Sequence, residues 1–358
     1  MSLKSQTATT TVASSQQLSA ITPHVSSDRL LNDFIPPRHF DDARFSTYRA
    51  NPTYPSQQTT LDRLTAVAKT LNTSNTGWKT RFRMTTKKAP AIYMDGGFGV
   101  GKTHLLASLA HEVGLERTAY GTFVEYTNLV GALGFATTVD ALSQKTLVCI
   151  DEFELDDPGD TVLMSRLLRE LADRGIALAA TSNTLPDSLG EGRFAAEDFL
   201  REIQAMAQRF EVLRVDGEDY RRRSVPKTMP GLDDETLAEK TRNLDISGTR
   251  TLDTFDEVLE HLKHVHPSRY GAMLDGIGLV AFTHVHPLND QSTGLRFVVL
   301  VDRLYDRDVP VLLGGSGLDG LFSDDMLKGG YRKKYYRALS RLGSLAQTGR
   351  TLVNEPVQ

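Results

Sequence analysis

Three absences narrow the kinds of protein that this sequence can encode. Only one cysteine, Cys149, occurs in 358 residues, so no internal disulfide can form and the chain suits a reducing, cytoplasmic compartment. No apolar run reaches the length of about 18 residues that a membrane-spanning helix needs. Neither sign of charge prevails, because 41 Lys and Arg stand against 45 Asp and Glu. Attraction to nucleic acid or anionic lipid must therefore be local.

The first 28 residues contain little that could target the chain. They are rich in Ser, Thr, Gln and Ala, and no apolar segment follows Lys4, which argues against a secretory signal. A transit peptide stays open, although Lys4 is the only basic residue before Arg29. The composition predicts a disordered tail over residues 1–28.

Length and a proline-containing stretch divide the rest of the chain. A chain of 358 residues corresponds to roughly two domains. Prolines follow the run Arg221–Arg223 and mark a boundary. We expect a first domain over residues 29–224, a linker over 225–235 and a smaller second domain over 236–350.

The most specific pattern is a glycine loop between an apolar run and a helical pattern. The stretch AIYMDGGFGVGKTHLLASLA contains GGFGVGKT, a complete match to the phosphate-binding loop G-x-x-x-x-G-K-[ST]. Glycines let backbone amides approach phosphate, and the following helix adds its free N–H groups. We expect Lys102 at the outer phosphates of ATP and Thr103 as a ligand of Mg²⁺. The expected nucleotide-binding residues are Gly96, Gly97, Phe98, Gly99, Val100, Gly101, Lys102, Thr103 and His104.

Two further strands are expected to end beside this loop. The apolar run LVCI leads into Asp151 and Glu152, an arrangement in which the first acid holds Mg²⁺ and the second polarises the attacking water. A predicted strand over 176–181 leads to Asn183, which would orient that water or would form an Asx turn. Another strand is expected at 121–126. The fold class is therefore α/β, with the parallel sheet and flanking helices of a P-loop NTPase.

The second domain repeats part of this pattern. From Leu279 the chain reads strand, polar loop, helix, strand and polar tip, in parallel with the first domain. Thr283 and His284 stand where the first copy has its two acids, so we interpret the repeat as a βαβ-like unit without catalytic acids. Chance similarity is the alternative. Residues 251–255 are expected to form the start of a helix, and the domain is α/β or helical.

Several side chains of the second domain could contact a ligand, and each has a structural alternative. Arg296 and Arg337 could act as a second nucleotide sensor or form surface ion pairs. The basic segment 328–337, with its interleaved tyrosines, could contact phosphate groups or anionic lipid, or could be a solvated helix face. The histidines between 261 and 286 lack cysteine or a fixed zinc spacing and predict no metal site.

Several segments resemble a known family. GGFGVGKT, IDEFELDD, ATSNTLPDSL and RVDGEDYRRR, together with LRFVVLVDRLYDR and YRALSRL, are similar to the ZapE-type, division-associated branch of the AAA+ ATPases, over roughly residues 30–345. The resemblance implies ring-like homo-oligomers and a protein partner such as a division polymer. It also implies a role at the division site or in membrane-protein quality control, with peripheral contact at the inner membrane. Better-known members carry a longer His- and Arg-rich segment where this chain has 117–140, so substrate contacts inferred from it are not carried over.

An AAA+ ATPase also needs an arginine that a neighbouring subunit supplies to the γ-phosphate. Family members carry arginines just before Phe199, where this chain has Ala196 and Asp198. Arg209 closes a predicted helix before a strand and is favoured; the alternative is a cation that stabilises a helix C-terminus. The candidates are Arg193, Arg201 and Arg209.

Two functions fit these observations. The first is an AAA+ motor that hydrolyses ATP and remodels or regulates a protein partner. In it Lys102 and Mg²⁺ stabilise the γ-phosphate charge, Glu152 and Asn183 place the water, and a neighbour's Arg209 completes the site. The second is a nucleic-acid-associated ATPase of the helicase-loader type, which the near-neutral net charge disfavours. No base-reading motif separates ATP from GTP.

Overall fold

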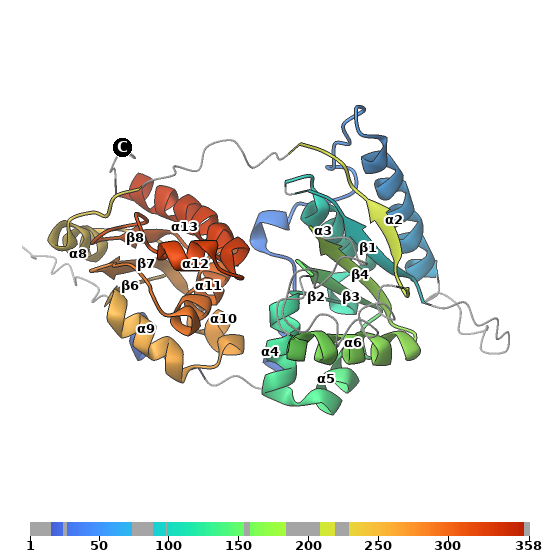
Figure 1. Cartoon of the computed structure of the whole chain (residues 1–358), viewed down its shortest axis with the longest axis horizontal. Coiled ribbons are helices and arrows are strands. Elements are labelled where there is room, and N and C mark those ends of the chain that lie inside the picture. The colour runs from blue at the N-terminus through green and yellow to red at the C-terminus, as the bar shows by residue number, and fades with distance from the viewer. Residues whose placement is uncertain are drawn as a thin grey trace, which may run out of the picture. The chain divides into compact units, whose positions relative to one another are not determined.

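The computed structural model describes residues 16–23, 27–73, 89–97, 99–153, 158–183, 208–218 and 229–353. The chain divides into two compact units. The phosphate-loop unit comprises His24–Ser224, and the C-terminal unit combines Met1–Pro23 with Val225–Gln358. Each unit contains a parallel sheet with helices packed on it (Figure 1).

The phosphate-loop unit is built on a five-stranded parallel sheet with the order β2-β3-β4-β1-β5. Because β4 lies between β1 and β3, the segments that leave the carboxyl ends of these three strands start at one edge of the sheet. The strands are β1 (Ala91–Asp95), β2 (Thr118–Thr122), β3 (Leu147–Asp151), β4 (Ala177–Ser182) and β5 (Glu211–Arg214).

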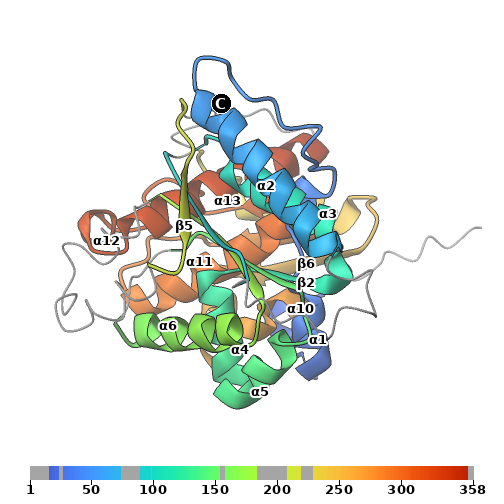
Figure 2. The same cartoon turned by 90° about the vertical axis from the view of Figure 1, so that its right-hand side faces the viewer.

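Helices cover both faces of this sheet, and for that reason β3 is buried along its whole length. Leu147 and Cys149 belong to the cluster that includes α2 and α3, whereas Val148 and Ile150 belong to the cluster that includes α4 and α6. Figure 2 shows these two helix layers on opposite sides of the strands. The helices are α1 (Ser27–Asn32), α2 (Pro55–Thr73), α3 (Lys102–Val113), α4 (Phe123–Leu133), α5 (Phe135–Leu142) and α6 (Pro158–Asp173).

The strand expected at 121–126 is wrong. The strand β2 ends at Thr122, whose hydroxyl accepts the N–H of Glu125 while the carboxylate of Glu125 accepts the N–H of Thr122. This capping box starts α4 at Phe123, so the apolar residues that follow lie on a helix.

The C-terminal unit is an α/β structure with its own three-stranded parallel sheet, in the order β6-β7-β8. The repeat noted in the sequence forms the unit β7-α11-β8 of this separate sheet. The strands are β6 (Thr249–Thr254), β7 (Ile277–Thr283) and β8 (Val311–Leu313). The helices are α8 (Asp234–Asn243), α9 (Phe255–His264), α10 (Tyr270–Met273), α11 (Gln291–Asp306), α12 (Asp324–Lys328) and α13 (Arg332–Leu352).

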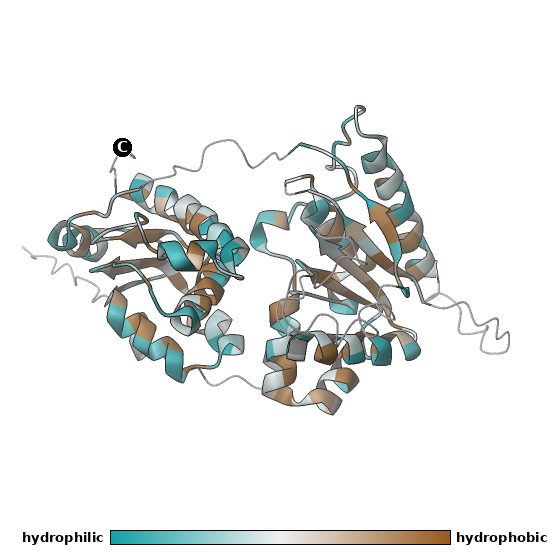
Figure 3. Cartoon of the chain, viewed as in Figure 1, coloured by the Kyte–Doolittle hydropathy of each residue, from teal (hydrophilic) through white to brown (hydrophobic). Residues whose placement is uncertain are grey.

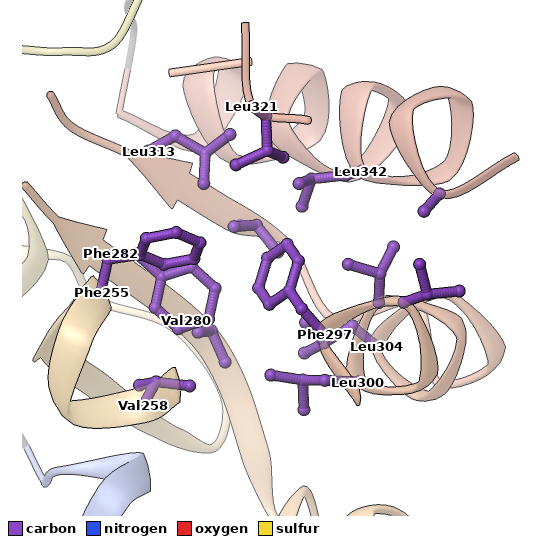
Figure 4. Close-up of a cluster of buried hydrophobic side chains, with 14 of the residues drawn as sticks. Phe255, Val258, Val280, Phe282, Phe297, Leu300, Leu304, Leu313, Leu321 and Leu342 are labelled. Carbon is purple, nitrogen blue, oxygen red and sulfur yellow. The ribbon is translucent and has the colours of Figure 1, made fainter. Parts of the chain in front are cut away.

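The core of the C-terminal unit lies mainly on one face of its sheet. Phe282 of β7 packs there against Phe255 of α9 and Phe297 of α11, and Leu342 of α13 joins the same cluster (Figure 4). Leu237 of α8 belongs to a smaller cluster with residues of the opposite face. Figure 3 shows apolar residues along the strands and mixed polar and apolar residues on helices such as α9.

Two boundaries of the C-terminal unit differ from expectation. Residues 251–254, expected to open a helix, instead complete strand β6, and the helix begins at Phe255 because Thr254 and Glu257 form a second capping box. The linker expected at 225–235 is too long. Met229 is buried and its N–H donates to Asp319, and the N–H of Leu232 donates to the carbonyl of Leu313.

The disordered tail expected over residues 1–28 is wrong for residues 16–23, which are ordered in the structure. A 3₁₀ turn, η1 (Leu18–Ala20), packs against α9 and β6 of the C-terminal unit. Leu18 is 0% exposed, so it contributes to that unit's core. The chain's first described residues therefore belong to the same unit as its last.

Candidate active site

The glycine loop follows β1 and leads directly into α3, as its sequence predicts. Gly101 precedes the helix in the left-handed conformation with φ of 92°, and a Cβ there would lie 2.7 Å from the ring of Tyr48. A Cβ on Gly96 would lie 2.1 Å from the carbonyl oxygen of Val215. Both positions therefore require glycine. Phe98 of the expected loop lies outside the described residues.

Lys102 joins the glycine loop to the tip of β4. Its side chain is 7% exposed, and Nζ donates to the carbonyl oxygens of Gly96 (2.8 Å) and Gly97 (2.6 Å) and to Oδ1 of Asn183 (3.0 Å). The sheet order explains the last contact, since β4 lies next to β1. Lys102 and Asn183, both named as site residues from the sequence, are thus in direct contact.

Asp151 lies at the end of β3, with 5% of its surface exposed. Its carboxylate accepts hydrogen bonds from side chains of three other elements. Oδ1 accepts the hydroxyl of Thr103 (3.3 Å) and the hydroxyl of Thr181. Oδ2 accepts the hydroxyl of Tyr120 from β2 (3.0 Å). Burial first, and the charge of Asp151 next, raise the pKa of Tyr120 well above its usual value, so Tyr120 stays a proton donor.

Glu152 follows with a backbone conformation that few residues adopt. Its φ is 54°, and its N–H donates to Oδ1 of Asp151 (3.1 Å) and to the hydroxyl of Thr181 (3.0 Å). These bonds hold a left-handed residue directly after the strand, where such strain is commonly tied to function. The side chain of Glu152 is half-buried.

The segment that precedes α2 packs against the start of α3. His104 Nε2 lies 3.1 Å from the hydroxyl of Thr47 and 3.2 Å from the carbonyl oxygen of Arg44, and its ring packs against Tyr48. The hydroxyl of Tyr48 donates to the carbonyl of Val100. The side chain of His104, expected at the nucleotide, thus faces this segment.

The described residues that meet at this edge offer oxygen donors rather than a metal-binding cluster of His and Cys. Thr103 contributes a hydroxyl and Asp151 a carboxylate, and such oxygen ligands suit Mg²⁺. No group of three or more His, Cys, Asp or Glu that could hold a metal occurs among the described residues.

Most of the chain matches a family of known proteins. The model of the AFG1-like ATPase family matches residues 24–244 and 230–351. These two matches span most of the sequence. The chain belongs to the AFG1-like ATPase family. The match identifies it as a P-loop ATPase, which binds nucleotide.

The individual relatives described next are each 28% identical to this AFG1-like ATPase over the matched residues. The cell division protein ZapE of Escherichia coli (strain K12) is 28% identical over 301 residues, covering 73% of this chain and 79% of ZapE. An uncharacterized protein of Schizosaccharomyces pombe is 28% identical over 148 residues, covering 37% of this chain and 33% of the relative.

Solved structures similar to this AFG1-like ATPase are also remote. A crystal structure of DnaI covers 50% of this chain and 94% of DnaI, with 17% identity and a TM-score of 0.38. The replication initiator DnaA bound to AMPPCP and single-stranded DNA covers 88% of this chain and 90% of DnaA, with 10% identity and a TM-score of 0.39.

The candidate trans arginine of this AFG1-like ATPase lies far from its own phosphate loop in the sheet topology. Arg209 precedes β5, at the amino end of the parallel strands, and pairs with Asp173 at 3.0 Å. Its side chain is 39% exposed. Arg193 and Arg201 are not among the residues that the structure describes.

The candidate second sensors of the C-terminal unit have structural partners. Arg296 donates to the carbonyl oxygen of Leu262 at 2.9 Å, and Arg337 pairs with Asp302 at 3.0 Å. Arg341 from the same helix also pairs with Asp302.

Among the helices that the structure describes, none combines the length and the apolar composition that a membrane span requires.

Two residues of the site were not predicted from the sequence. Tyr120 and Thr181 both donate to Asp151, and each lies on a strand next to β3. The signal for Thr181 was its place two residues before Asn183 on a strand already predicted. No such signal pointed to Tyr120, because the predicted strand begins at residue 121, whereas β2 begins at Thr118.

Proposed function

We propose that this AFG1-like ATPase hydrolyses ATP at the carboxyl edge of its five-stranded sheet and uses the energy to remodel or regulate a protein partner. The observation that carries the site is the convergence of three strand ends. Lys102 follows β1, Asp151 ends β3 and Asn183 follows β4. Their contacts, Lys102 with Asn183 and Thr103 with Asp151, join the three segments directly.

The residues of the site have separate tasks in this proposal. The ammonium of Lys102, now bonded to loop carbonyls, would exchange these for the outer phosphate oxygens and stabilise their charge. Glu152 would polarise the attacking water, and Asn183 would orient it. Gly97, Gly99 and the start of α3 would supply backbone N–H groups to the phosphates.

The donor set beside Lys102 fits magnesium. When bound, the ion neutralises charge on the phosphate oxygens. Thr103 and Asp151 would hold it, Asp151 through coordinated water. Because Tyr120 and Thr181 both donate to Asp151, the carboxylate is oriented before any ligand arrives.

We further propose that the active form is a homo-oligomeric ring. Arg209 is removed from its own phosphate loop in the topology and is partly exposed, so a neighbouring subunit is the site that it can serve. By its similarity to ZapE, we infer a role in cell division, with a division polymer as partner. We place the protein in the cytoplasm, in peripheral contact with the division site or inner membrane.

The helicase-loader alternative depended on the basic segment 328–337. Tyr335 of this segment is 1% exposed and belongs to the core, and Arg337 is paired with Asp302. These contacts favour the structural interpretation of the segment. They therefore support the protein-directed motor over nucleic-acid binding.

The decisive experiment measures ATP hydrolysis and particle mass together across protein concentration. We expect specific activity to rise as the protein assembles with ATP. Glu152→Gln should form a stable, ATP-bound and inactive oligomer, because Gln keeps the size of Glu but cannot act as a base. Glu112→Gln is the matched control, since Glu112 is an exposed carboxylate at the far end of α3.

The outcomes separate the parts of the proposal. Full activity in Glu152→Gln would refute the catalytic assignment. A monomer whose turnover is independent of concentration would refute the ring and the trans arginine while leaving the ATPase site in place.

A further inference from the structure

Residues 16–21 lie on the C-terminal unit as a bound peptide lies on its receptor. The N–H of Gln16 donates to the carbonyl of Arg250 at 3.1 Å, and the N–H of Leu252 donates to the carbonyl of Gln16 at 3.0 Å. These bonds extend the sheet at β6, which is an edge strand. Addition of a strand to a sheet edge is a common mode of peptide recognition.

The central contacts of the segment are made by Leu18 and Ser19. The side chain of Leu18 is 0% exposed and lies in the cluster that contains Phe255 and Val258 of α9. Asp253, only 2% exposed, accepts the N–H of Leu18 (2.9 Å), the N–H of Ser19 (2.9 Å) and the hydroxyl of Ser19 (2.6 Å). A carboxyl group buried this deeply needs such donors, and here the segment provides them.

A third contact fixes the end of the segment. Nε2 of His261 on α9 donates to the carbonyl oxygen of Ile21 at 2.8 Å. Along six residues the main chain is therefore contacted at Gln16, Leu18, Ser19 and Ile21, the side chain of Leu18 is fully buried, and that of Ile21 packs against the same cluster. Recognition by backbone groups plus one anchor is typical of short linear peptides.

We propose that β6, Asp253 and α9 form a peptide-docking groove whose resident ligand, residues 16–21, binds reversibly. The partner that fits this groove is a protein segment with the same features: an extended residue, a leucine, a serine or threonine, and one helical turn. Such a segment would bind by displacing residues 16–21.

Displacement would alter how the two units are connected. The phosphate-loop unit is joined to the C-terminal unit at two places in the sequence, after Pro23 and after Ser224. Release of residues 16–21 would leave only the second connection. A partner peptide would thereby loosen the link between the units without touching the nucleotide site.

The test uses the full-length chain and a labelled peptide that covers residues 14–23, followed by fluorescence anisotropy. Leu18→Asp in the protein should expel the resident segment and expose the groove, so the free peptide should bind saturably. Wild type should need at least about tenfold more peptide, because a tethered ligand competes at an effective concentration of millimolar order. A folded Leu18→Asp protein that does not bind the peptide would overturn the proposal.

The contribution of Asp253 is tested in the Leu18→Asp protein. Adding Asp253→Asn should weaken peptide binding at least about tenfold, since Asn lacks the charge and replaces one of the two acceptor oxygens that the segment uses with an NH₂ donor. Asp256→Asn is the matched control, because this exposed carboxylate of the same region pairs with His286 and not with the segment. Equal affinity in the two variants would contradict the role of Asp253.

A second measurement covers the case in which Leu18→Asp does not fold. A protease site inserted between Pro23 and His24 of the otherwise wild-type chain allows the segment to be cut free. Exchange of the cut segment for labelled peptide after dilution would support the proposal. A segment that never exchanges, or one that leaves without being replaced, would overturn it.

Discussion

The ammonium of Lys102 lies 3.0 Å from the amide oxygen of Asn183, which ties the phosphate loop to the tip of β4. Replacing Asn183 by Ala should lower kcat by about 10²-fold and change KM little, because the contact matters most when charge develops. Steady-state kinetics separate the two constants. Asn72→Ala, at a hydrogen bond to Arg117 in the same unit, should leave kcat unchanged.

Tyr120 supports Asp151 from the neighbouring strand, and its removal tests the magnesium site. Tyr120→Phe keeps the ring but removes the hydroxyl that donates to Asp151 at 3.0 Å. The loss of a hydrogen bond to a charged group is worth about 1.5–3 kcal/mol. We expect the Mg²⁺ concentration that gives half-maximal activity to rise about tenfold. An unchanged magnesium dependence would show that the Tyr120 hydroxyl does not support the metal site.

Gly101 combines a left-handed backbone with close packing, and the two effects can be separated. Gly101→Ala would place a Cβ 2.7 Å from Tyr48 and strain φ at 92°. We expect ATP affinity to fall at least about tenfold. Gly134 has a similar φ of 80° but no atom within 4 Å of a Cβ. Gly134→Ala should therefore cost about 1–2 kcal/mol of unfolding free energy and leave ATP affinity intact.

Arg209 is predicted to act in a neighbouring subunit. Arg209→Ala should reduce turnover by about 10³-fold with ATP affinity preserved, by analogy with arginine fingers. Mixing this variant with Glu152→Gln should restore part of the activity, because some mixed interfaces combine an intact Glu152 with an intact Arg209. Arg174→Ala, at the comparable exposed pair with Asp140, is the control and should keep full turnover.

Asp302 of α11 forms ion pairs with α13 and should make the free energy of unfolding depend on pH. Burial alone would raise the pKa of Asp302, but attraction to Arg337 and Arg341 outweighs it and lowers the pKa below its usual value. The ionised carboxylate therefore stabilises the fold fully above the unfolded-state pKa of about 3.9, and this contribution is lost as pH falls through the lower folded value.

Asp302→Asn should consequently cost about 3 kcal/mol of unfolding free energy at pH 7 and less below about pH 4. Urea unfolding at both pH values measures the difference. Asp324→Asn, whose pair with Lys328 is largely exposed, should change stability by less than about 0.5 kcal/mol. A pH-independent cost of Asp302→Asn would show that packing, not charge, is lost.

The parts of the site that are contiguous in sequence could be predicted, because their chemistry is local. The loop that ends in Lys102 needs glycines at fixed spacing, and the carboxylates of Asp151 and Glu152 must follow an apolar strand. The contacts of Tyr120 and Thr181 with Asp151 could not be assigned in this way, because they depend on the order of strands in the sheet.

The wrong boundaries have a common physical cause. At 121–126 and at 251–255, apolar and β-branched residues run across a strand end into a helix start, so periodicity alone misplaces the change. In both places the marker was a threonine followed three residues later by glutamate, Thr122 with Glu125 and Thr254 with Glu257. The capping box locates a helix start more sharply than hydrophobicity does.

The ordered segment 16–23 could not be recognised from composition, because Ser, Thr and Gln dominate its surroundings. A single leucine and a buried carboxyl group more than two hundred residues away make its central contacts. Neither feature changes the average polarity of the region.

The division of the C-terminal unit between both ends of the sequence makes the ATPase unit an insert within a host domain. The host's first piece is Met1–Pro23, and its described residues 16–23 contribute Leu18 to the core and donors to Asp253. A shortened chain that begins at α1 would therefore carry a deletion in a hydrophobic core rather than a trimmed end. The loss of stability would affect strands and helices at the opposite end of the sequence.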